Sequence, residues 1–183
     1  NDVTLSWENL YSHNRKILDA SSNRYFFVAQ PLELKVTGLP KAFQAKLPLH
    51  PEHPERGFRE YTVKPEGTEA STALWIADKD AKAMQPGQTM RLMELFNIQI
   101  QTITDNTVTA VYTSESYEDV RKIKAQLIQW IPKGSEYPAE VVQQDATAIA
   151  GFADVACKKL KPDDIIQFER FGFVRVDTVG EKL

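Results

Sequence analysis

The chain has 183 residues, of which 42% are hydrophobic, 26% charged and 10% aromatic, and this composition excludes collagen-like, low-complexity and disordered proteins. Its single cysteine, Cys157, excludes an internal disulfide and a cysteine-rich zinc module, so we expect a reducing, cytoplasmic compartment. The net charge of −3 hides mildly basic ends and an acidic middle, because residues 63–157 carry eight Lys or Arg against thirteen Asp or Glu. Charge therefore does not decide for or against an RNA partner, and without a long apolar run we expect no membrane partner.

One helix is expected, at the start of the chain. Ser6 can cap it, and the apolar residues that follow fall mostly at helical spacing and end near Asp19. These apolar residues are Trp7, Leu10, Tyr11, Ile17 and Leu18. Because the sequence starts at Asn1 rather than at a methionine, we expect a processed chain or a piece of a longer one.

Everything after Arg24 is expected to form short strands. The expected strands are residues 25–29, 32–36, 42–47, 61–63, 73–77, 89–96, 98–103, 107–113, 127–131, 139–142, 165–170 and 173–176. Asp105-Asn106 and Phe171-Gly172 are expected as tight turns, the proline-rich stretch 47–59 as a loop or kinked edge, and 115–124 as a polar connection with a short helical turn. About a dozen strands without long helices favour barrels or sandwiches.

Few residues suit catalysis. His50 and His53 stand three apart among prolines with no third ligand near, so we interpret them as surface loop histidines. Asp78 and Asp80 are not expected to act as an acid/base pair, and Cys157 is expected to be a half-buried structural thiol. The sequence holds no phosphate-binding glycine loop and no nucleophile elbow. We therefore expect a chain that binds rather than reacts, with no catalytic residue and no metal.

Two segments, 23–27 and 167–175, interleave aromatic, basic and amide side chains. Gln presents a donor and an acceptor together, and Arg presents a planar fork, so both suit base edges or phosphates. Proteins read single-stranded RNA through such groups, with splayed bases stacked on aromatic side chains. From residue types alone the alternative stays open that these are core strands whose charged residues face solvent.

The motifs W-E-N-L-Y, H-P-E-H-P-E-R-G-F-R, A-L-W-I and Q-F-E-R-F-G-F occur in this order along almost the whole chain. Together they resemble the class I glutamyl/glutaminyl-tRNA synthetase family. Residues 7–28, with W-E-N-L-Y and N-R-Y-F-F-V, are similar to the junction after the catalytic core of archaeal-type glutamyl-tRNA synthetases. L-H-P-E-H-P-E-R-G-F-R at 49–59 resembles the H-P-x-x-P-x-x-G-x-R loop of the family, which is called the H-P loop below. A-L-W-I at 73–76 is similar to an internal strand, and Q-F-E-R-F-G-F at 167–173 resembles the C-terminal signature.

The resemblance implies a mainly β fold with two β-barrels that grip the tRNA anticodon stem-loop, preceded by a short helix. In this family a proximal barrel is split by an inserted distal barrel. On that layout residues 1–23 are a helical remnant of the stem-contact region, 24–77 plus 160–183 form the proximal barrel, and 78–159 form the distal barrel.

Four residues match positions that bind the anticodon in the family. The resemblance implies that Arg24, Gln167 and Arg170 read the middle anticodon base and that Arg91 contacts the first. Strict strand alternation would put Gln167 and Arg170 on opposite faces, so Arg170 is expected at the turn or after a bulge. For the arginines, a surface salt bridge or a phosphate contact remains the alternative.

Departures from the family pattern bear on specificity. Where glutaminyl relatives carry a basic residue that reads the third anticodon base and a second arginine, this chain has Ala83 and Met93. These differences favour a glutamyl enzyme, and tolerance at the third base, with glutamine tRNA also charged, is a hypothesis.

The ATP motifs of the family are missing, so we expect this chain to bind tRNA without activating glutamate and to need no cofactor, while the parent would use ATP and Mg²⁺. The alternatives are the same region of a glutaminyl-tRNA synthetase, a non-enzymatic barrel like the ribosomal proteins that bind 5S RNA, and a protein-interaction module. A DNA partner is not expected.

Overall fold

The computed structural model describes residues 7–183, with side chains from Asn14 onward, and the predicted cap Ser6 lies outside this range. The mainly β fold predicted from the sequence is confirmed. The elements are α1 Trp7–Ser21, β1 Arg24–Tyr25, β2 Phe27–Ala29, β3 Pro31–Thr37, β4 Phe43–Pro48, η1 Pro54–Arg56, β5 Phe58–Val63, β6 Thr72–Ala77, α2 Asp78–Lys82, β7 Thr89–Leu92, β8 Asn97–Ile103, β9 Thr107–Ser114, α3 Glu118–Arg121, β10 Gln126–Ile128, β11 Ile131–Pro132, β12 Glu136–Val142, β13 Ala148–Asp154, η2 Val155–Lys159, β14 Ile165–Phe168 and β15 Gly172–Arg175.

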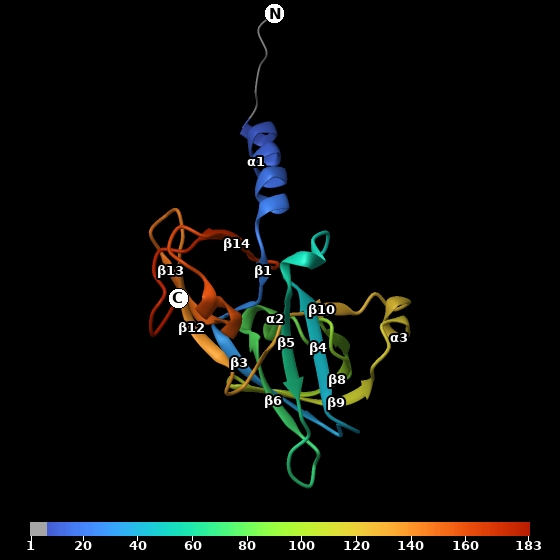
Figure 1. Ribbon diagram of the computed structural model, residues 1–183. Coiled ribbons are helices and arrows are strands. Elements are labelled where there is room, and N and C mark those ends of the chain that lie inside the picture. The colour runs from blue at the N-terminus through green and yellow to red at the C-terminus, as the bar shows by residue number, and fades with distance from the viewer. Residues whose placement is uncertain (1–6) are drawn as a thin grey trace, which may run out of the picture.

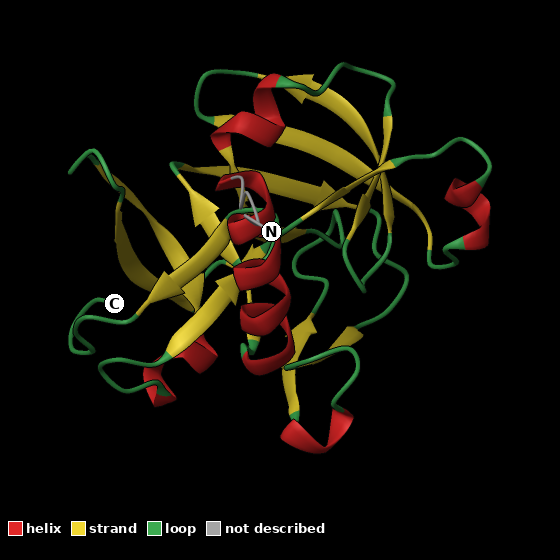
Figure 2. Ribbon diagram, turned by 90° about the horizontal axis from the view of Figure 1, so that it is seen from above, coloured by secondary structure: helices red, strands yellow, loops and turns green. Residues whose placement is uncertain are grey.

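Helix α1 projects from the β-structured body, and the H-P loop between β4 and β5 lies at its base (Figure 1). The helix ends at Ser21, two residues beyond its predicted end. Its last carbonyls are bound by that loop, because the His50 ring donates Nε2–H to the Asp19 carbonyl at 2.8 Å and Arg56 donates to the Ala20 carbonyl at 2.8 Å. The view along the helix shows α1 standing over the strands (Figure 2).

The prediction of two surface loop histidines is wrong for His50. Its side chain is buried, with Nδ1 accepting a hydrogen bond from the Glu52 backbone N–H while Nε2–H serves the helix. The physical reason is that unpaired carbonyls at a helix end need donors, and the proline-rich loop supplies one here. Among the described residues no cluster of His, Cys, Asp or Glu could hold a metal ion.

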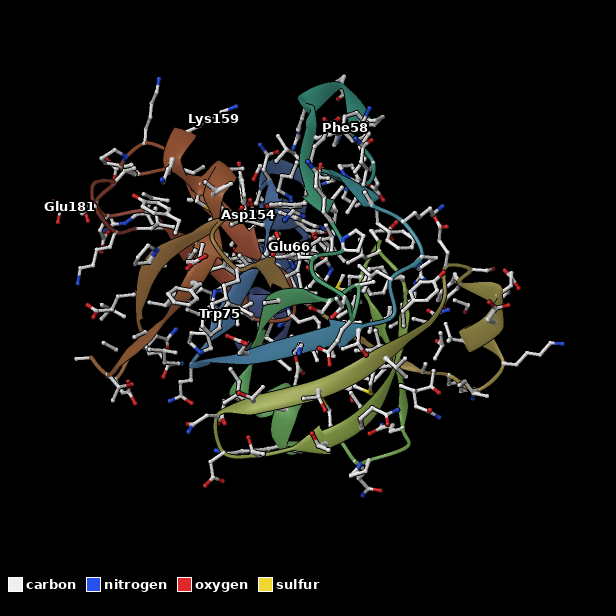
Figure 3. The ribbon with its side chains drawn as sticks, turned by 90° about the horizontal axis from the view of Figure 1, so that it is seen from below. Phe58, Glu66, Trp75, Asp154, Lys159 and Glu181 are labelled. Carbon is white, nitrogen blue, oxygen red and sulfur yellow. The ribbon has the colours of Figure 1, made fainter. Side chains whose placement is uncertain are left out.

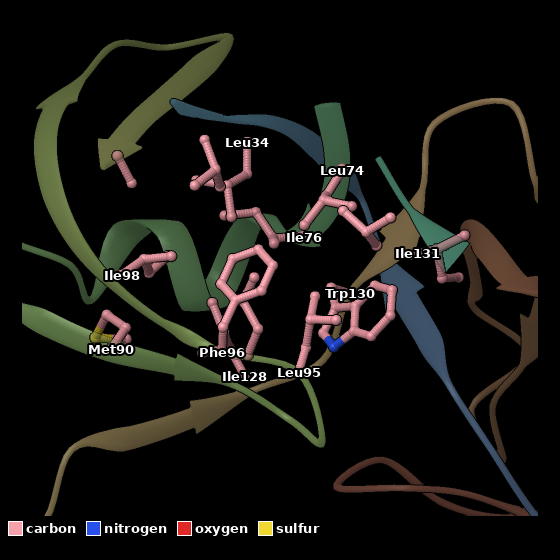
Figure 4. Close-up of a cluster of buried hydrophobic side chains, with 14 of the residues drawn as sticks. Leu34, Leu74, Ile76, Met90, Leu95, Phe96, Ile98, Ile128, Trp130 and Ile131 are labelled. Carbon is pink, nitrogen blue, oxygen red and sulfur yellow. The ribbon is translucent and has the colours of Figure 1, made fainter. Parts of the chain in front are cut away.

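A curled seven-stranded sheet, in the order β10-β7-β8-β9-β3-β6-β11, forms most of the body. The predicted hairpin around Asp105-Asn106 is present as the antiparallel pair β8–β9, whereas β3 pairs in parallel with β9. Inward-facing side chains of these strands, of the connections between them and of the β4–β5 pair form the main core, in which Phe96, Trp130 and Leu74 are fully buried (Figure 4).

A second group of strands consists of two three-stranded sheets, β12-β13-β2 and β1-β14-β15. Its core includes Tyr25, Phe27, Tyr137 and Phe168, with the rings of Phe27 and Phe168 stacked at 4.9 Å. Cys157 lies in this core and is fully buried, more so than predicted.

The arrangement of strands differs from the predicted barrel boundaries. Strands β3 and β6, which the prediction assigns to the proximal barrel with residues 24–77, lie in the same sheet as β7–β10 of the predicted distal segment 78–159. Conversely, β12 and β13 of that segment share a sheet with β2. The division into a proximal and a distal barrel stays a prediction, while the sheets show that β3–β11 and β12–β15 pair largely among themselves. The deciding contact is the β3–β9 pairing, a non-local one that strand patterns do not reveal.

Candidate nucleic-acid interface

Two short strands from opposite ends of the chain bring Arg24 and Gln167 together. β1 pairs in parallel with β14, and in this register Arg24 lies directly opposite Gln167. The pairing continues on both sides, since the Gln167 N–H donates to the Asn23 carbonyl at 2.9 Å and the Glu169 N–H to the Tyr25 carbonyl at 3.0 Å. Directly paired residues point to the same face of a sheet, so the two predicted site residues share a face.

Arg170 lies in the turn between β14 and β15, as one of the two expected solutions requires. β14 ends at Phe168, and Arg170 has a left-handed backbone with φ of +60°. The turn is closed by the Phe171 N–H donating to the Phe168 carbonyl at 3.0 Å. Because Arg170 lies in the turn and not in the strand, the alternation of side chains along β14 does not place it on the face opposite Gln167.

The hollow next to the predicted residues has a volume of about 590 Å³ and lies between the last turns of α1 and the β14–β15 turn. Another hollow, of about 390 Å³, lies along β12 and β15, away from these residues. The first of these, called the α1 hollow below, is lined by Arg15, Lys16, Asp19, Gln167, Arg170, Phe171, Gly172 and Phe173. Its wall thus combines positive charge from the helix with amide and aromatic groups from the turn. These are the groups by which proteins hold phosphates and stack unpaired bases.

Arg24 does not itself line the α1 hollow but is bound to Asp19, which does. Its Nη2 donates to Asp19 Oδ1 at 3.1 Å, while its Nε has no hydrogen-bond partner among the described residues. In the described part of the chain the neighbouring Asn23 Oδ1 and Gln167 Oε1 also lack partners although both atoms are buried. Buried polar atoms are normally satisfied, so these three atoms mark a place where the polar groups beside the α1 hollow are not fully paired within the described chain.

A second hollow, of about 380 Å³, lies on the other side of the same turn. Its lining residues include Gln30, Lys79, Asp80, Gln129, Arg170 and Phe171. Here Arg170 donates both terminal amino groups to the Asp80 carboxylate, at 2.8 and 3.0 Å. Asp80 was not expected to act as an acid/base residue, and in the structure it is the partner of the predicted site residue Arg170.

The turn is held from below by Glu169. Its carboxylate accepts from Arg59 at 3.3 Å, and its backbone carbonyl accepts from the Gln129 side chain. Burial raises the pKa of Glu169, with Arg59 opposing that rise, and the pKa of Arg59 is raised because Asp154 and Glu169 outweigh the burial of the guanidinium. Asp154 and the start of β5 at Phe58 can be followed in Figure 3. Arg59 is the last residue of the H-P loop motif. The motif indicated the loop, but it did not indicate that Arg59 binds Glu169 below the turn.

Arg91 lies on β7, apart from these residues. Its side chain is buried, and its Nη1 donates to Asn97 Oδ1 at 2.8 Å and to the Glu115 carbonyl at 3.0 Å. The exposed ring of Tyr117 lies 5.5 Å from its guanidinium carbon. The structure thus brings Arg24, Gln167 and Arg170 together and leaves Arg91 outside that group.

Within residues 7–183, no helix is both long and apolar enough to cross a membrane.

Two family models, each described as the anti-codon binding domain of tRNA synthetases class I (E and Q), match the chain at residues 22–117 and 127–177. The glutamate–tRNA ligase of Pyrococcus abyssi is 40% identical over 100% of this chain and 31% of its own length. The glutamate–tRNA ligase of Pyrococcus furiosus is 38% identical over 97% of the chain and 30% of its own length, and that of Methanopyrus kandleri 36% over 98% and 31%.

The chain thus spans about a third of the length of the curated relatives it matches. These relatives are glutamate–tRNA ligases, which agrees with the predicted similarity to glutamyl rather than glutaminyl enzymes. The matched residues include Arg24, Gln167 and Arg170 and both strands that bring them together. The chain belongs to the anticodon-binding domain family of the class I tRNA synthetases for glutamate and glutamine.

Proposed function

We propose that this chain is the tRNA-binding part of an enzyme that attaches glutamate to tRNA, and that it reads the anticodon loop in the α1 hollow. The observation that carries the proposal is the β1–β14 pairing, which sets Arg24 beside Gln167 at the turn that carries Arg170. Groups from both ends of the chain meet there, next to basic residues of α1.

Each residue has a chemical role in this proposal. Arg15 and Lys16 neutralise backbone phosphates, and Phe171 and Phe173 offer faces on which a base can stack. Arg24 and Gln167, paired across β1 and β14, read the edge of the middle anticodon base, and Arg170 adds guanidinium donors from the turn. Arg91 contacts the first anticodon base through the donors that Asn97 and Glu115 leave free.

The rest of the reaction belongs to the part of the relatives that this chain does not cover. We infer that ATP, Mg²⁺ and glutamate bind there and that the chain alone does not activate glutamate. Tolerance at the third anticodon base, with glutamine tRNA as a second substrate of the parent, is part of the proposal, because the sequence has Ala83 and Met93 where glutaminyl relatives have basic residues.

Binding of the chain to two anticodon stem-loops tests the proposal. One has the glutamate anticodon and the other has its middle base changed, and both are measured at two salt concentrations. We expect affinity that falls with salt and that is lost on the base change. Equal binding to both would leave a grip on the RNA backbone and remove the base-reading roles, while binding to neither would remove the proposal.

A further inference from the structure

Asp80 holds Arg170 by both ends of its guanidinium fork. The carboxylate belongs to α2, directly after β6, and its residue is 6% exposed. Its Oδ2 and Oδ1 accept from Nη1 and Nη2 of Arg170 at 3.0 and 2.8 Å. Gln126 Nε2 lies 3.5 Å from the same Oδ1 and approaches from β10. Asp80 is thus fixed in the body while Arg170 reaches it from the turn ninety residues away in sequence.

This pairing leaves part of the fork available. A guanidinium has five N–H donors, of which the carboxylate uses two, and the side chain of Arg170 remains 41% exposed. The same side chain lines the hollows on both sides of the turn. Its remaining donors are therefore accessible and are aimed by a bidentate contact, which restricts the fork more than a single hydrogen bond would.

The pairing also compensates the charge of Arg170 locally. A phosphate contact draws its free energy from an uncompensated cation that displaces counterions, whereas a base edge needs donors in a defined direction. A neutralised and oriented fork suits the second task.

We propose that Asp80 is a positioning residue that makes Arg170 a reader of base edges rather than a phosphate contact. This inference rests on the proposed function, because it concerns how the same site discriminates between bases. It assigns to Asp80 a role in specificity, exerted through Arg170 without contact to the RNA.

Asp80→Asn tests the inference, with Asp78→Asn as the matched control. Both changes remove one negative charge from α2, but Asp78 pairs with the exposed Lys82 and not with Arg170. We expect Asp80→Asn to lower the affinity ratio between the glutamate stem-loop and its middle-base variant by about tenfold, the scale of one bidentate base contact. We also expect a steeper salt dependence, by up to about 0.7 in the logarithmic slope, because Arg170 regains a free charge. Asp78→Asn should leave the ratio unchanged.

A second variant separates positioning from folding. Asp80→Glu keeps the negative charge, so the salt dependence of binding should stay at the wild-type value. Its affinity ratio between the two stem-loops should lie between that of the wild type and that of Asp80→Asn. An unchanged ratio in Asp80→Asn, or an equal loss of affinity for both stem-loops together with a lower melting temperature, would overturn the inference. A wild-type chain that binds both stem-loops equally would instead overturn the proposed function, and the inference with it, before any substitution is made.

Discussion

Arg59 and Asp154, ninety-five residues apart in the chain, form an ion pair at 2.5 Å with both side chains almost completely buried. Asp154 ends β13 and also caps η2 by accepting from the Ala156 N–H at 3.0 Å, while Arg59 extends from β5 under the rings of Tyr25 and Phe26. One guanidinium therefore joins the main core to the second group of strands and, through Glu169, to the turn that carries Arg170.

Arg59→Met should destabilise the chain by about 3–5 kcal/mol, because it leaves the buried Asp154 carboxylate without a counter-ion. The measurement is the free energy of unfolding from urea titration. Lys46→Met is the matched control, since Lys46 pairs with Glu60 on the exposed side of the neighbouring strand, and it should cost no more than about 1 kcal/mol. Equal costs for the two variants would show that the buried pair does not link the two groups of strands.

Stability should depend on pH through Glu169. Burial raises its pKa above the ordinary value of 4.5, so the folded chain keeps this proton at pH values where the unfolded chain has lost it. The stabilisation is complete below about pH 4.5 and is lost as the pH rises through the raised native pKa. We expect Glu169→Gln to remove this part of the decline, measured as the free energy of unfolding from about pH 4 to neutrality. Glu60→Gln, an exposed change on β5, should leave the wild-type slope in place, and a matching slope in Glu169→Gln would contradict the assignment.

Gly151→Ala should be strongly destabilising, by about 1–3 kcal/mol, although the backbone at this position is ordinary. A Cβ at Gly151 would lie 2.4 Å from the Val28 carbonyl oxygen and 2.8 Å from the Phe27 ring, where β13 pairs with β2. Gly180→Ala meets no atom within 4 Å and serves as the control. Thermal unfolding of the two variants decides the matter: a melting temperature for Gly151→Ala as high as that of Gly180→Ala would mean that the two strands separate easily.

Gln167→Leu should weaken binding of the glutamate stem-loop by roughly 1–3 kcal/mol, or about five- to 150-fold, while affecting the middle-base variant much less. The reason is that the substitution removes both the donor and the acceptor that Gln167 presents beside Arg24. Gln44→Leu, on the exposed side of β4, is the corresponding change away from the site and should leave both affinities intact. Similar losses for both stem-loops would assign Gln167 to the framework of the site instead.

Local sequence signals predicted several local features, although the strand β13, Ala148–Asp154, is absent from the expected strands. The end of α1, the β8–β9 hairpin at Asp105-Asn106 and the β14–β15 turn all follow from helical spacing, strand alternation and turn residues close together in the chain. The position of Arg170 was predicted for the same reason, since two alternating residues on one site require an interruption between them.

What the sequence did not reveal depends on contacts between distant segments. The parallel pairing of β3 with β9 determines which strands share a sheet, and the predicted boundary after residue 77 falls in the middle of that sheet. The partners of Arg59 and Arg170 were missed for the same reason, because Asp154 and Asp80 have no local feature that distinguishes them from other carboxylates. His50 was misassigned because the carbonyl it binds, that of Asp19, belongs to a helix residue thirty-one positions earlier.

The H-P loop and Arg24 attach α1 to the body only through its last turn, among the described side chains. His50 and Arg56 donate hydrogen bonds to carbonyls of this final turn, and Arg24 donates to the Asp19 side chain in the same turn. The point of attachment therefore lies next to the α1 hollow, which Asp19 lines. A helix of 15 residues is about 22 Å long at 1.5 Å per residue. For a helix of this length held at one end, a rotation of about 5° at the held end would displace the other end by about 2 Å, so the direction of α1 depends on the geometry of its last turn.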